Sequence, residues 1–215
     1  MRRRIDPDEL AELGTGLFRW TAIHPDADPA PEPATPADWG PYVGSVAYAA
    51  PEALVLVDPL VPADRPKLQA ALDALVEAHG GSVTILTTVK WHRRSRDELA
   101  ERYGATTSRA KGGLPEGVET VTIAGAGETM VWLPEPRALV PGDRLLGDDA
   151  GGLRLCPDSW LRYLPSGMRQ AELREALRPL LDLPVELVLV AHGEPVLAGG
   201  REAIARALER AAGDG

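Results

Sequence analysis

Residues 131–147, VWLPEPRALVPGDRLLG, contain two short apolar runs separated by a proline-containing turn. The runs predict one strand over residues 128–133 and another over 137–140, because proline interrupts the backbone hydrogen bonding of a sheet between them. Gly142 and Asp143 follow the second run after a single proline, Pro141. The segment therefore predicts a strand pair that places a carboxylate just beyond its last strand.

Similar apolar runs occur on both sides of this segment and alternate with apolar residues at helical spacing, which indicates an α/β fold. The other predicted strands cover residues 15–23, 43–49, 53–58, 83–88, 118–124, 153–156 and 185–190, with 43–49 and 53–58 forming a hairpin. The predicted helices cover residues 65–79 and 96–104, the segment from Leu173 to Leu181, and a last segment around Ile204 and Leu208.

Particular residues are expected to define the ends of the first two helices. Asp64 is a candidate cap for the helix over 65–79, Pro66 suits its first turn, and Gly80 ends it. Ser95 and Glu98 have the spacing of a capping box, which predicts the start of the second helix.

A proline-rich segment, residues 24–41, separates the N-terminal strand from the rest of the chain. Proline at this density excludes a packed helix or a central strand, so we expect a long surface loop, of the kind that often covers a binding site. Residues 1–14 are polar and predict a short helix or a tail. Because the segment before the loop is too short for a domain, we expect a single domain over residues 1–215.

The composition excludes several classes of protein. With 44% hydrophobic residues the chain can build a large core, and its net charge of −9 argues against a nucleic-acid partner. A single cysteine, Cys156, excludes an intramolecular disulfide and cysteine-rich zinc sites, and we expect it to be buried and inert. No apolar run approaches the roughly 20 residues of a membrane span, and no secretion signal is evident. We therefore expect a cytoplasmic protein without a membrane partner.

Polar residues that could bind a ligand or take part in catalysis follow four of the predicted strands. They are Asp58, the segment VKWHRR at 89–94, Asp143 and His192. Ligands of open α/β structures gather beyond the carboxyl ends of strands, so these residues are expected to converge on one edge.

The order of these segments resembles the metallo-β-lactamase superfamily, especially its glyoxalase II-like and lactonase-like members. The matching pieces are ALVLVDPL (53–60), TILTT (84–88), ERYGA (101–105), VWLPEPRALVPGDRLLG (131–147) and LVLVAHGEPV (187–196). The resemblance implies an α/β fold of the αββα type, a sandwich of two mixed β-sheets flanked by helices. It also implies a hydrolase that acts on an ester, a lactone or a thioester.

The resemblance assigns roles to individual residues. Asp143 matches the family's metal-bridging aspartate, His192 its last metal-ligating histidine, and Asp58 a structural acid. The family's His-x-His-x-Asp-His motif is reduced here to His92, and no histidine stands in residues 124–128. The metal site is therefore degenerate. We expect two metals to be excluded, and at most one zinc or iron ion held by Asp143, His192 and His92.

Three functions remain open on these residues. The first is a hydrolase with Asp143 and His192 as catalytic residues. The second is a non-catalytic relative, a pseudoenzyme that binds a small anionic ligand or a protein partner without metal. The third is a metal-independent hydrolase with His192 as general base. Basic side chains near the site oppose a dication and favour an anion, so Lys90, Arg93 and Arg94 are candidate substrate-binding residues, and Trp91 is a candidate for lining the pocket. Glu128 is expected to be an exposed strand residue, with replacement of a lost ligand as the alternative.

Overall fold

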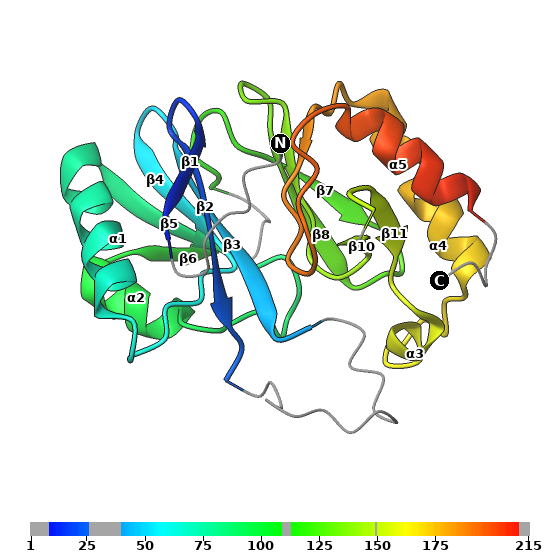
Figure 1. Cartoon of the computed structure of the whole chain (residues 1–215), viewed down its shortest axis with the longest axis horizontal. Coiled ribbons are helices and arrows are strands. Elements are labelled where there is room, and N and C mark those ends of the chain that lie inside the picture. Colours follow the sequence, from blue (N-terminus) through cyan, green and yellow to red (C-terminus); the bar gives the residue numbers. More distant parts are fainter. Residues whose placement is uncertain (1–8, 26–39, 109–112, 149, 211–215) are drawn as a thin grey trace. The chain divides into compact units, whose positions relative to one another are not determined.

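A computed structural model describes residues 9–25, 40–108, 113–148 and 150–210 (Figure 1). Its contacts divide the chain into two compact units. The first contains Met1–Thr87 and Trp91–Val118, and the second contains Thr88–Lys90 and Glu119–Gly215. Most of the predicted loop at 24–41 lies outside the described residues, and the expectation of one domain stays a prediction.

The first unit is built on a six-stranded mixed sheet in the order β1-β2-β3-β4-β5-β6. Strands β1 to β4 pair antiparallel, whereas β4, β5 and β6 are parallel, as expected for strands joined through helices. Helices α1 and α2 make these two crossovers and lie on one side of the sheet in Figure 1. The strands are β1 (Ala11–Gly14), β2 (Leu17–Ile23), β3 (Tyr42–Ala49), β4 (Ala53–Val57), β5 (Ser82–Leu86) and β6 (Thr106–Ser108), and the helices are α1 (Pro66–His79) and α2 (Arg96–Tyr103).

The core of the first unit lies between this sheet and its helices. Leu54 and Leu56 of β4 pack with Ile85 of β5 and with Leu68 and Leu72 of α1. Every residue of β4 is buried, which explains why ALVLV is apolar throughout instead of alternating. The predicted hairpin of β3 and β4 is confirmed.

Three local expectations for the first unit were wrong. Residues 11–14 form strand β1, not a helix or a tail, because they pair with β2. The N-cap of α1 is Arg65, not Asp64, and it makes no side-chain cap. Ser95 occupies the N-cap of α2, but its hydroxyl exchanges hydrogen bonds with the backbone of Val61 and leaves the predicted capping box unformed.

Asp73 joins helix α1 to helix α2. Its carboxylate accepts hydrogen bonds from both the Nε and an NH2 group of Arg102, at 2.8 and 2.6 Å, and from the Tyr103 hydroxyl at 2.8 Å. Gln69 of α1 donates a further bond to Asp73 at 2.9 Å. These donors, Arg102 foremost, lower the pKa of Asp73 to about 2.

We expect Asp73→Asn to lower the free energy of unfolding by no more than about 1 kcal/mol at neutral pH, because solvent screens the pair. The folded pKa lies below the unfolded one, so the stabilisation is complete above about pH 4 and is lost as the pH falls towards 2. Urea unfolding of both proteins across this range measures the loss. The exposed Asp64→Asn is the matched control, and a difference between wild type and Asp73→Asn that does not shrink in acid would contradict the prediction.

The second unit contains a four-stranded mixed sheet in the order β12-β9-β8-β7 and a two-stranded sheet of β10 and β11. Strands β7, β8 and β9 pair antiparallel, and β12 lies parallel to β9. The strands are β7 (Glu119–Ile123), β8 (Glu128–Leu133), β9 (Ala138–Val140), β10 (Leu145–Gly147), β11 (Leu153–Leu155) and β12 (Leu187–Val188). The helices are α3 (Asp158–Leu161), α4 (Gln170–Leu177), the 3-10 helix η1 (Arg178–Asp182) and α5 (Gly200–Glu209).

The core of the second unit joins both of its sheets to its helices. Met130 and Leu139 of the larger sheet share one buried cluster with Leu146 of β10 and with Leu173 and Ile204 of the helices. Helix α5 packs against β11 and η1. The strand pair predicted from residues 131–147 is confirmed as β8 and β9, whereas the strand predicted over 185–190 is reduced to two residues. Among the described residues, no helix is long and apolar enough to cross a membrane.

Candidate functional site

Asp143 and His192 follow the ends of two neighbouring strands at the same edge of the sheet of the second unit. Strands β9 and β12 run parallel, with Leu187 opposite Ala138 and Val188 opposite Leu139. Asp143 follows the end of β9 and His192 follows the end of β12, so both side chains lie beyond the carboxyl ends of neighbouring parallel strands. The parallel register thus brings together two residues that are 49 positions apart in the chain.

The two side chains are buried and nearly in contact. Asp143 is 4% exposed and His192 is 8% exposed, and Oδ1 of Asp143 lies 3.3 Å from Nε2 of His192. A charge-assisted hydrogen bond between such groups is usually shorter, about 2.7–2.9 Å. Two ligand atoms about 2.0–2.1 Å from one tetrahedral metal ion are separated by about 3.3–3.4 Å. The donor set and its spacing therefore fit a carboxylate and an imidazole that share one ion.

An aromatic side chain that sequence reasoning did not single out for the site lies against His192. Trp160 of helix α3 meets the imidazole edge to face, with ring centroids 5.7 Å apart and an interplanar angle of 77°. Trp160 is half-buried and packs on the apolar core of the unit. It forms an apolar wall beside His192. Helix α3 has only four residues, which is too short for a periodic sequence signal.

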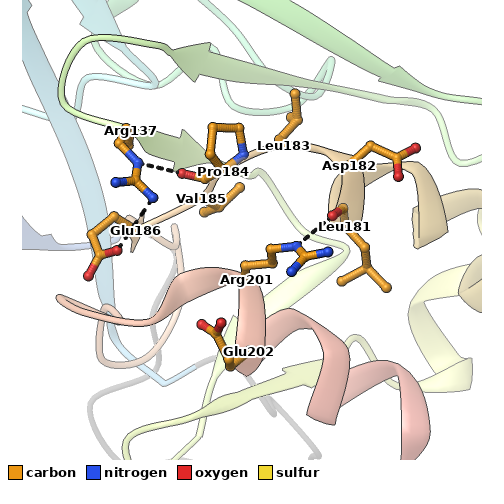
Figure 2. Close-up of a pocket in the computed structure, with 9 residues that line it drawn as sticks. All are labelled: Arg137, Leu181, Asp182, Leu183, Pro184, Val185, Glu186, Arg201 and Glu202. Atoms are coloured by element: carbon orange, nitrogen blue, oxygen red, sulfur yellow. Dashed lines mark hydrogen bonds and ion pairs between the residues drawn. The ribbon is translucent and has the colours of Figure 1, made fainter.

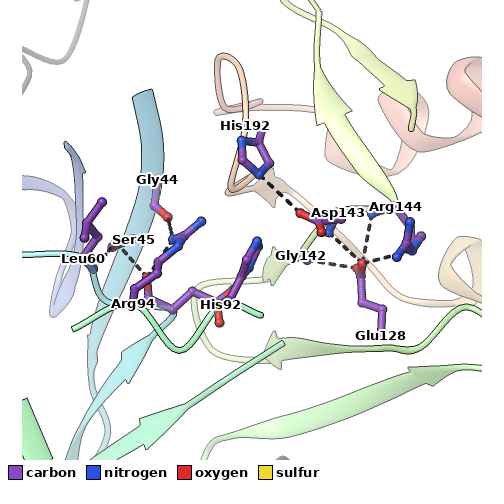
Figure 3. Close-up of polar contacts among 11 residues, drawn as sticks. Gly44, Ser45, Leu60, His92, Arg94, Glu128, Gly142, Asp143, Arg144 and His192 are labelled. Carbon is purple, nitrogen blue, oxygen red and sulfur yellow. Dashed lines mark hydrogen bonds and ion pairs between the residues drawn. The ribbon is translucent and has the colours of Figure 1, made fainter. Parts of the chain in front are cut away.

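The loop that carries Asp143 is held by Glu128, the first residue of β8 (Figure 3). Oε1 of Glu128 accepts the backbone N–H of Gly142 at 2.9 Å. Oε2 accepts the N–H of Asp143 at 2.7 Å and that of Arg144 at 2.9 Å. Three consecutive N–H groups thus converge on one carboxylate, the arrangement that backbone nests use to bind anions.

The expectation that Glu128 is exposed was wrong, because its side chain is fully buried. Burial, with a further contribution from the charge of Asp143, raises the pKa of Glu128 to about 7, although Arg144 and the backbone donors act in the opposite direction. The equally buried Arg144 lies 3.8 Å away and donates from Nε to the carbonyl of Ala126. Cys156 lies beside Arg144 and is buried as predicted, and its burial raises the pKa of its thiol to about 11.

Two glycines allow the segment of His192 to lie close to strand β10. The N–H of Gly147 donates to the carbonyl of His192 at 2.9 Å. Gly193 has a φ of +82°, and a Cβ there would lie 2.5 Å from the carbonyl oxygen of Gly147. A Cβ on Gly147 would in turn overlap the backbone of Glu194. Close backbone contact therefore fixes His192 relative to β10, which begins two residues after Asp143.

In the first unit, His92 and Asp58 form a buried pair. Nδ1 of His92 lies 2.8 Å from Oδ2 of Asp58, and the two side chains are 6% and 3% exposed. A carboxylate partner accepts hydrogen bonds, so the contact assigns the proton of this pair to Nδ1, and a neutral ring in this tautomer has its lone pair on Nε2. Asp58 follows β4 with a φ of +46°, a strained conformation of the kind found at functional sites. Asp58 thus makes contacts through both its carboxylate and its carbonyl, and its structural role stays a prediction.

The basic residues predicted to bind an anion are mostly engaged in other contacts. Arg94 donates from NH1 to the carbonyl of Gly44 at 2.8 Å (Figure 3). The same group donates to the carbonyl of Asp58 at 2.8 Å. Arg93 forms a surface ion pair with Asp97 at 2.9 Å. Lys90, in the second unit, is exposed, and Trp91, in the first, is 43% exposed.

A separate hollow of about 480 Å³ lies at the opposite ends of β9 and β12, where Arg137 and Glu186 precede the two strands (Figure 2). Nε of Arg137 donates to the carbonyl of Pro184 at 2.8 Å, and Nε of Arg201 donates to that of Leu181 at 2.7 Å. Arg201 thereby contacts the backbone of η1, and Arg137 contacts the segment between η1 and β12. These two hydrogen bonds explain the positions of Arg137 and Arg201 without a ligand.

The overall chain trace matches solved structures, although no protein-family model and no curated protein sequence matches the chain. Metallo-β-lactamase IND-7 is 14% identical, with 93% of this chain and 96% of that chain covered and a TM-score of 0.61. A metallo-β-lactamase from Erythrobacter litoralis is 15% identical, with 93% and 90% covered and a TM-score of 0.58. The chain has the metallo-β-lactamase fold.

The flavodiiron protein from Giardia intestinalis shares this metallo-β-lactamase fold with 14% identity and a TM-score of 0.59. Here 97% of this chain is covered but only 59% of that longer chain. The α/β fold class expected from the sequence is therefore confirmed, including mixed sheets with flanking helices. Because one fold serves unrelated reactions, the chemistry has to be argued from the site.

Proposed function

We propose that this protein is a hydrolase of the metallo-β-lactamase fold that uses one divalent metal ion. Asp143 and His192 are the two ligands from the second unit. The observation that carries the proposal is the 3.3 Å separation between Oδ1 of Asp143 and Nε2 of His192, both of them buried. A carboxylate and an imidazole at this distance suit zinc or iron coordination.

His92 is the third ligand of the proposal, as the resemblance of its segment to the family's metal motif implies. The contact with Asp58 supports this role, because metal-ligating histidines usually donate their other ring N–H to a carboxylate or a carbonyl. Two histidines and one carboxylate suffice for one ion with open positions. The chain lacks the remaining histidines of the family motif, so the proposal stops at one ion.

The proposed reaction is hydrolysis of an ester, a lactone or a thioester, as the resemblance implies. A divalent ion, when bound, would polarise the substrate carbonyl and acidify a water molecule. The side chains of Asp143 and His192 are close enough to bind such an ion together. Asp58 orients His92 by accepting the proton on Nδ1, so that the Nε2 lone pair of His92 is available to the ion. Trp160 supplies an apolar surface beside His192, which suits an acyl group with an apolar substituent. Names of similar structures, metallo-β-lactamase and flavodiiron protein, agree with metal use on this fold.

The alternative is a non-catalytic relative that binds a small anionic molecule without metal. That function would need Lys90, Arg93 and Arg94 to face a ligand. The contacts of Arg94 with two backbone carbonyls and of Arg93 with Asp97 weigh against it. A small-molecule substrate in the cytoplasm, without nucleic acid or membrane as partner, remains part of the proposal.

Metal analysis of protein purified without chelator tests the proposal. We expect about one zinc or iron ion per chain in the wild type, and its loss in an Asp143→Ala, His192→Ala double variant. The double variant Glu135→Ala, Asp182→Ala changes exposed acids of the same unit and should keep the metal. Metal-free wild-type protein that hydrolyses esters, and loses this activity in His192→Ala, would instead establish His192 as a metal-independent base. Metal-free protein without any esterase activity would favour the non-catalytic relative.

A further inference from the structure

We infer that Glu128 is a positioning residue, which holds residues 142–144 so that the carboxylate of Asp143 stays beside His192. The inference rests on the proposed metal site, since positioning Asp143 matters only if Asp143 acts. Glu128 itself is assigned no contact with metal or substrate. It acts through the backbone of the loop.

The first support is the number and direction of the hydrogen bonds. Three successive N–H groups point to one side of the loop, at residues 142, 143 and 144, and all three end on the Glu128 carboxylate at 2.7–2.9 Å. A run of converging N–H groups is stable in a buried setting only when an acceptor faces it. The loop conformation and the carboxylate therefore require each other.

The second support is that the backbone of Glu128 is itself fixed. Val89 forms a β-bridge with Glu128, and the N–H of Thr129 donates to the carbonyl of Thr88 at 3.0 Å. The strip Thr88–Lys90 belongs to the same compact unit. The backbone at Glu128 is thus held by hydrogen bonds, and the loop of Asp143 is bound to the Glu128 side chain.

Gly142 also lies very close to Thr88 and Glu128. A Cβ at Gly142 would lie 2.5 Å from Oγ1 of Thr88 and 3.2 Å from Oε2 of Glu128. The loop therefore approaches the strand as closely as glycine permits. A side chain of a different length at position 128 would leave the three N–H groups without an acceptor or push the loop away.

Two substitutions of Glu128 should remove different numbers of these hydrogen bonds. In Glu128→Gln, the side-chain oxygen can replace Oε2 and keep the bonds from Asp143 and Arg144, but its NH2 group then faces the N–H of Gly142. In Glu128→Ala, all three bonds are lost. Glu119→Gln, on the exposed side of β7 in the same unit, is the matched control.

The first experiment uses metal-free, chelator-treated full-length protein. Amide hydrogen exchange should be slow at residues 142–144 in the wild type and in Glu119→Gln. It should become faster at Gly142 in Glu128→Gln and at all three positions in Glu128→Ala. The ring signals of His192 in NMR spectra should shift strongly in Glu128→Ala, which releases Asp143, and less in Glu128→Gln, where only the repulsion at Gly142 displaces the loop. Unchanged exchange and unchanged His192 signals in Glu128→Gln would overturn the inference.

The second experiment measures affinity for Zn²⁺ by competition with a chelator. We expect Glu128→Gln to bind about tenfold more weakly and Glu128→Ala about 100-fold more weakly than the wild type, as outer-shell changes typically do. Glu119→Gln should bind like the wild type. Faster exchange without any change in Zn²⁺ affinity would overturn the positioning role and leave Glu128 as a stabilising residue only. A wild type that takes up no Zn²⁺ would contradict the proposed function. The positioning role of Glu128 would in that case be tested by the His192 signals of the metal-free protein.

Discussion

Gly193→Ala is expected to destabilise the protein by about 2–4 kcal/mol and to abolish metal binding. Part of this cost is the left-handed φ of +82°, which alanine adopts poorly. The larger part is the overlap of the new Cβ with the carbonyl group of Gly147, which is backbone and cannot rotate away. Relief requires the two segments to separate, and the hydrogen bond from Gly147 to the His192 carbonyl would then break. Urea unfolding and metal analysis measure the two effects.

Gly167→Ala is the matched control for Gly193→Ala. Gly167 also has a left-handed φ, +64°, but a Cβ there would meet no atom within 4 Å. Its substitution should cost only about 1–2 kcal/mol and leave metal binding intact. Equal losses of stability in the two variants, with metal retained in both, would mean that backbone contact between Gly147 and Gly193 does not position His192.

Much of the fold could be predicted from the sequence, because its strands are apolar runs bounded by turns. Residues 53–57 and 130–133 are examples of continuous apolar runs that are fully buried. The elements that were missed are short: β6 and β10 have three residues each, and α3 has four. Such segments are stabilised by tertiary contacts, not by a periodic pattern. Strand β1 was missed for a related reason, since its pairing with β2 and not its polar composition decides its structure.

The candidate site could be predicted only in part. Asp143 and His192 were identified because each follows an apolar strand, and the parallel register of β9 and β12 brings them together. Glu128 was misjudged because a single acidic residue at the start of a strand is usually solvated. Only three-dimensional contacts reveal that its oxygens face the backbone of residues 142–144. A Glu followed 14 residues later by Gly-Asp is not a local sequence pattern that indicates such a contact.

Arg144→Met is the second substitution with a large expected effect, and its cost should depend on pH. Arg144 is fully buried 3.8 Å from Glu128, and its charge favours the ionised form of that carboxyl. Methionine fills similar volume but leaves the ionised Glu128 without a cation in a buried site. Breaking a buried pair in this way typically costs about 3–5 kcal/mol. We expect this cost to be reached above about pH 8 and to be smaller near pH 5.

Glu128 takes up a proton on folding at neutral pH. The pKa of Glu128 is about 7 in the folded protein, above the ordinary value of 4.5, so the folded state holds a proton that the unfolded chain releases. Stability therefore falls as the pH rises between these two values. Without Arg144 the folded pKa is higher still, and the fall continues beyond pH 7. The difference in unfolding free energy between the wild type and Arg144→Met should consequently widen from pH 5 to pH 8.

Urea unfolding in the presence of chelator measures this widening without interference from bound metal. The double variant Glu128→Gln, Arg144→Met has no carboxyl to ionise at position 128, so its difference from Glu128→Gln should stay constant over the same pH range. A constant difference for Arg144→Met as well would mean that Glu128 stays ionised from pH 5 upwards. In that case the three backbone donors alone would outweigh the burial of the charge, and Arg144 would contribute packing and its bond to Ala126, not charge compensation.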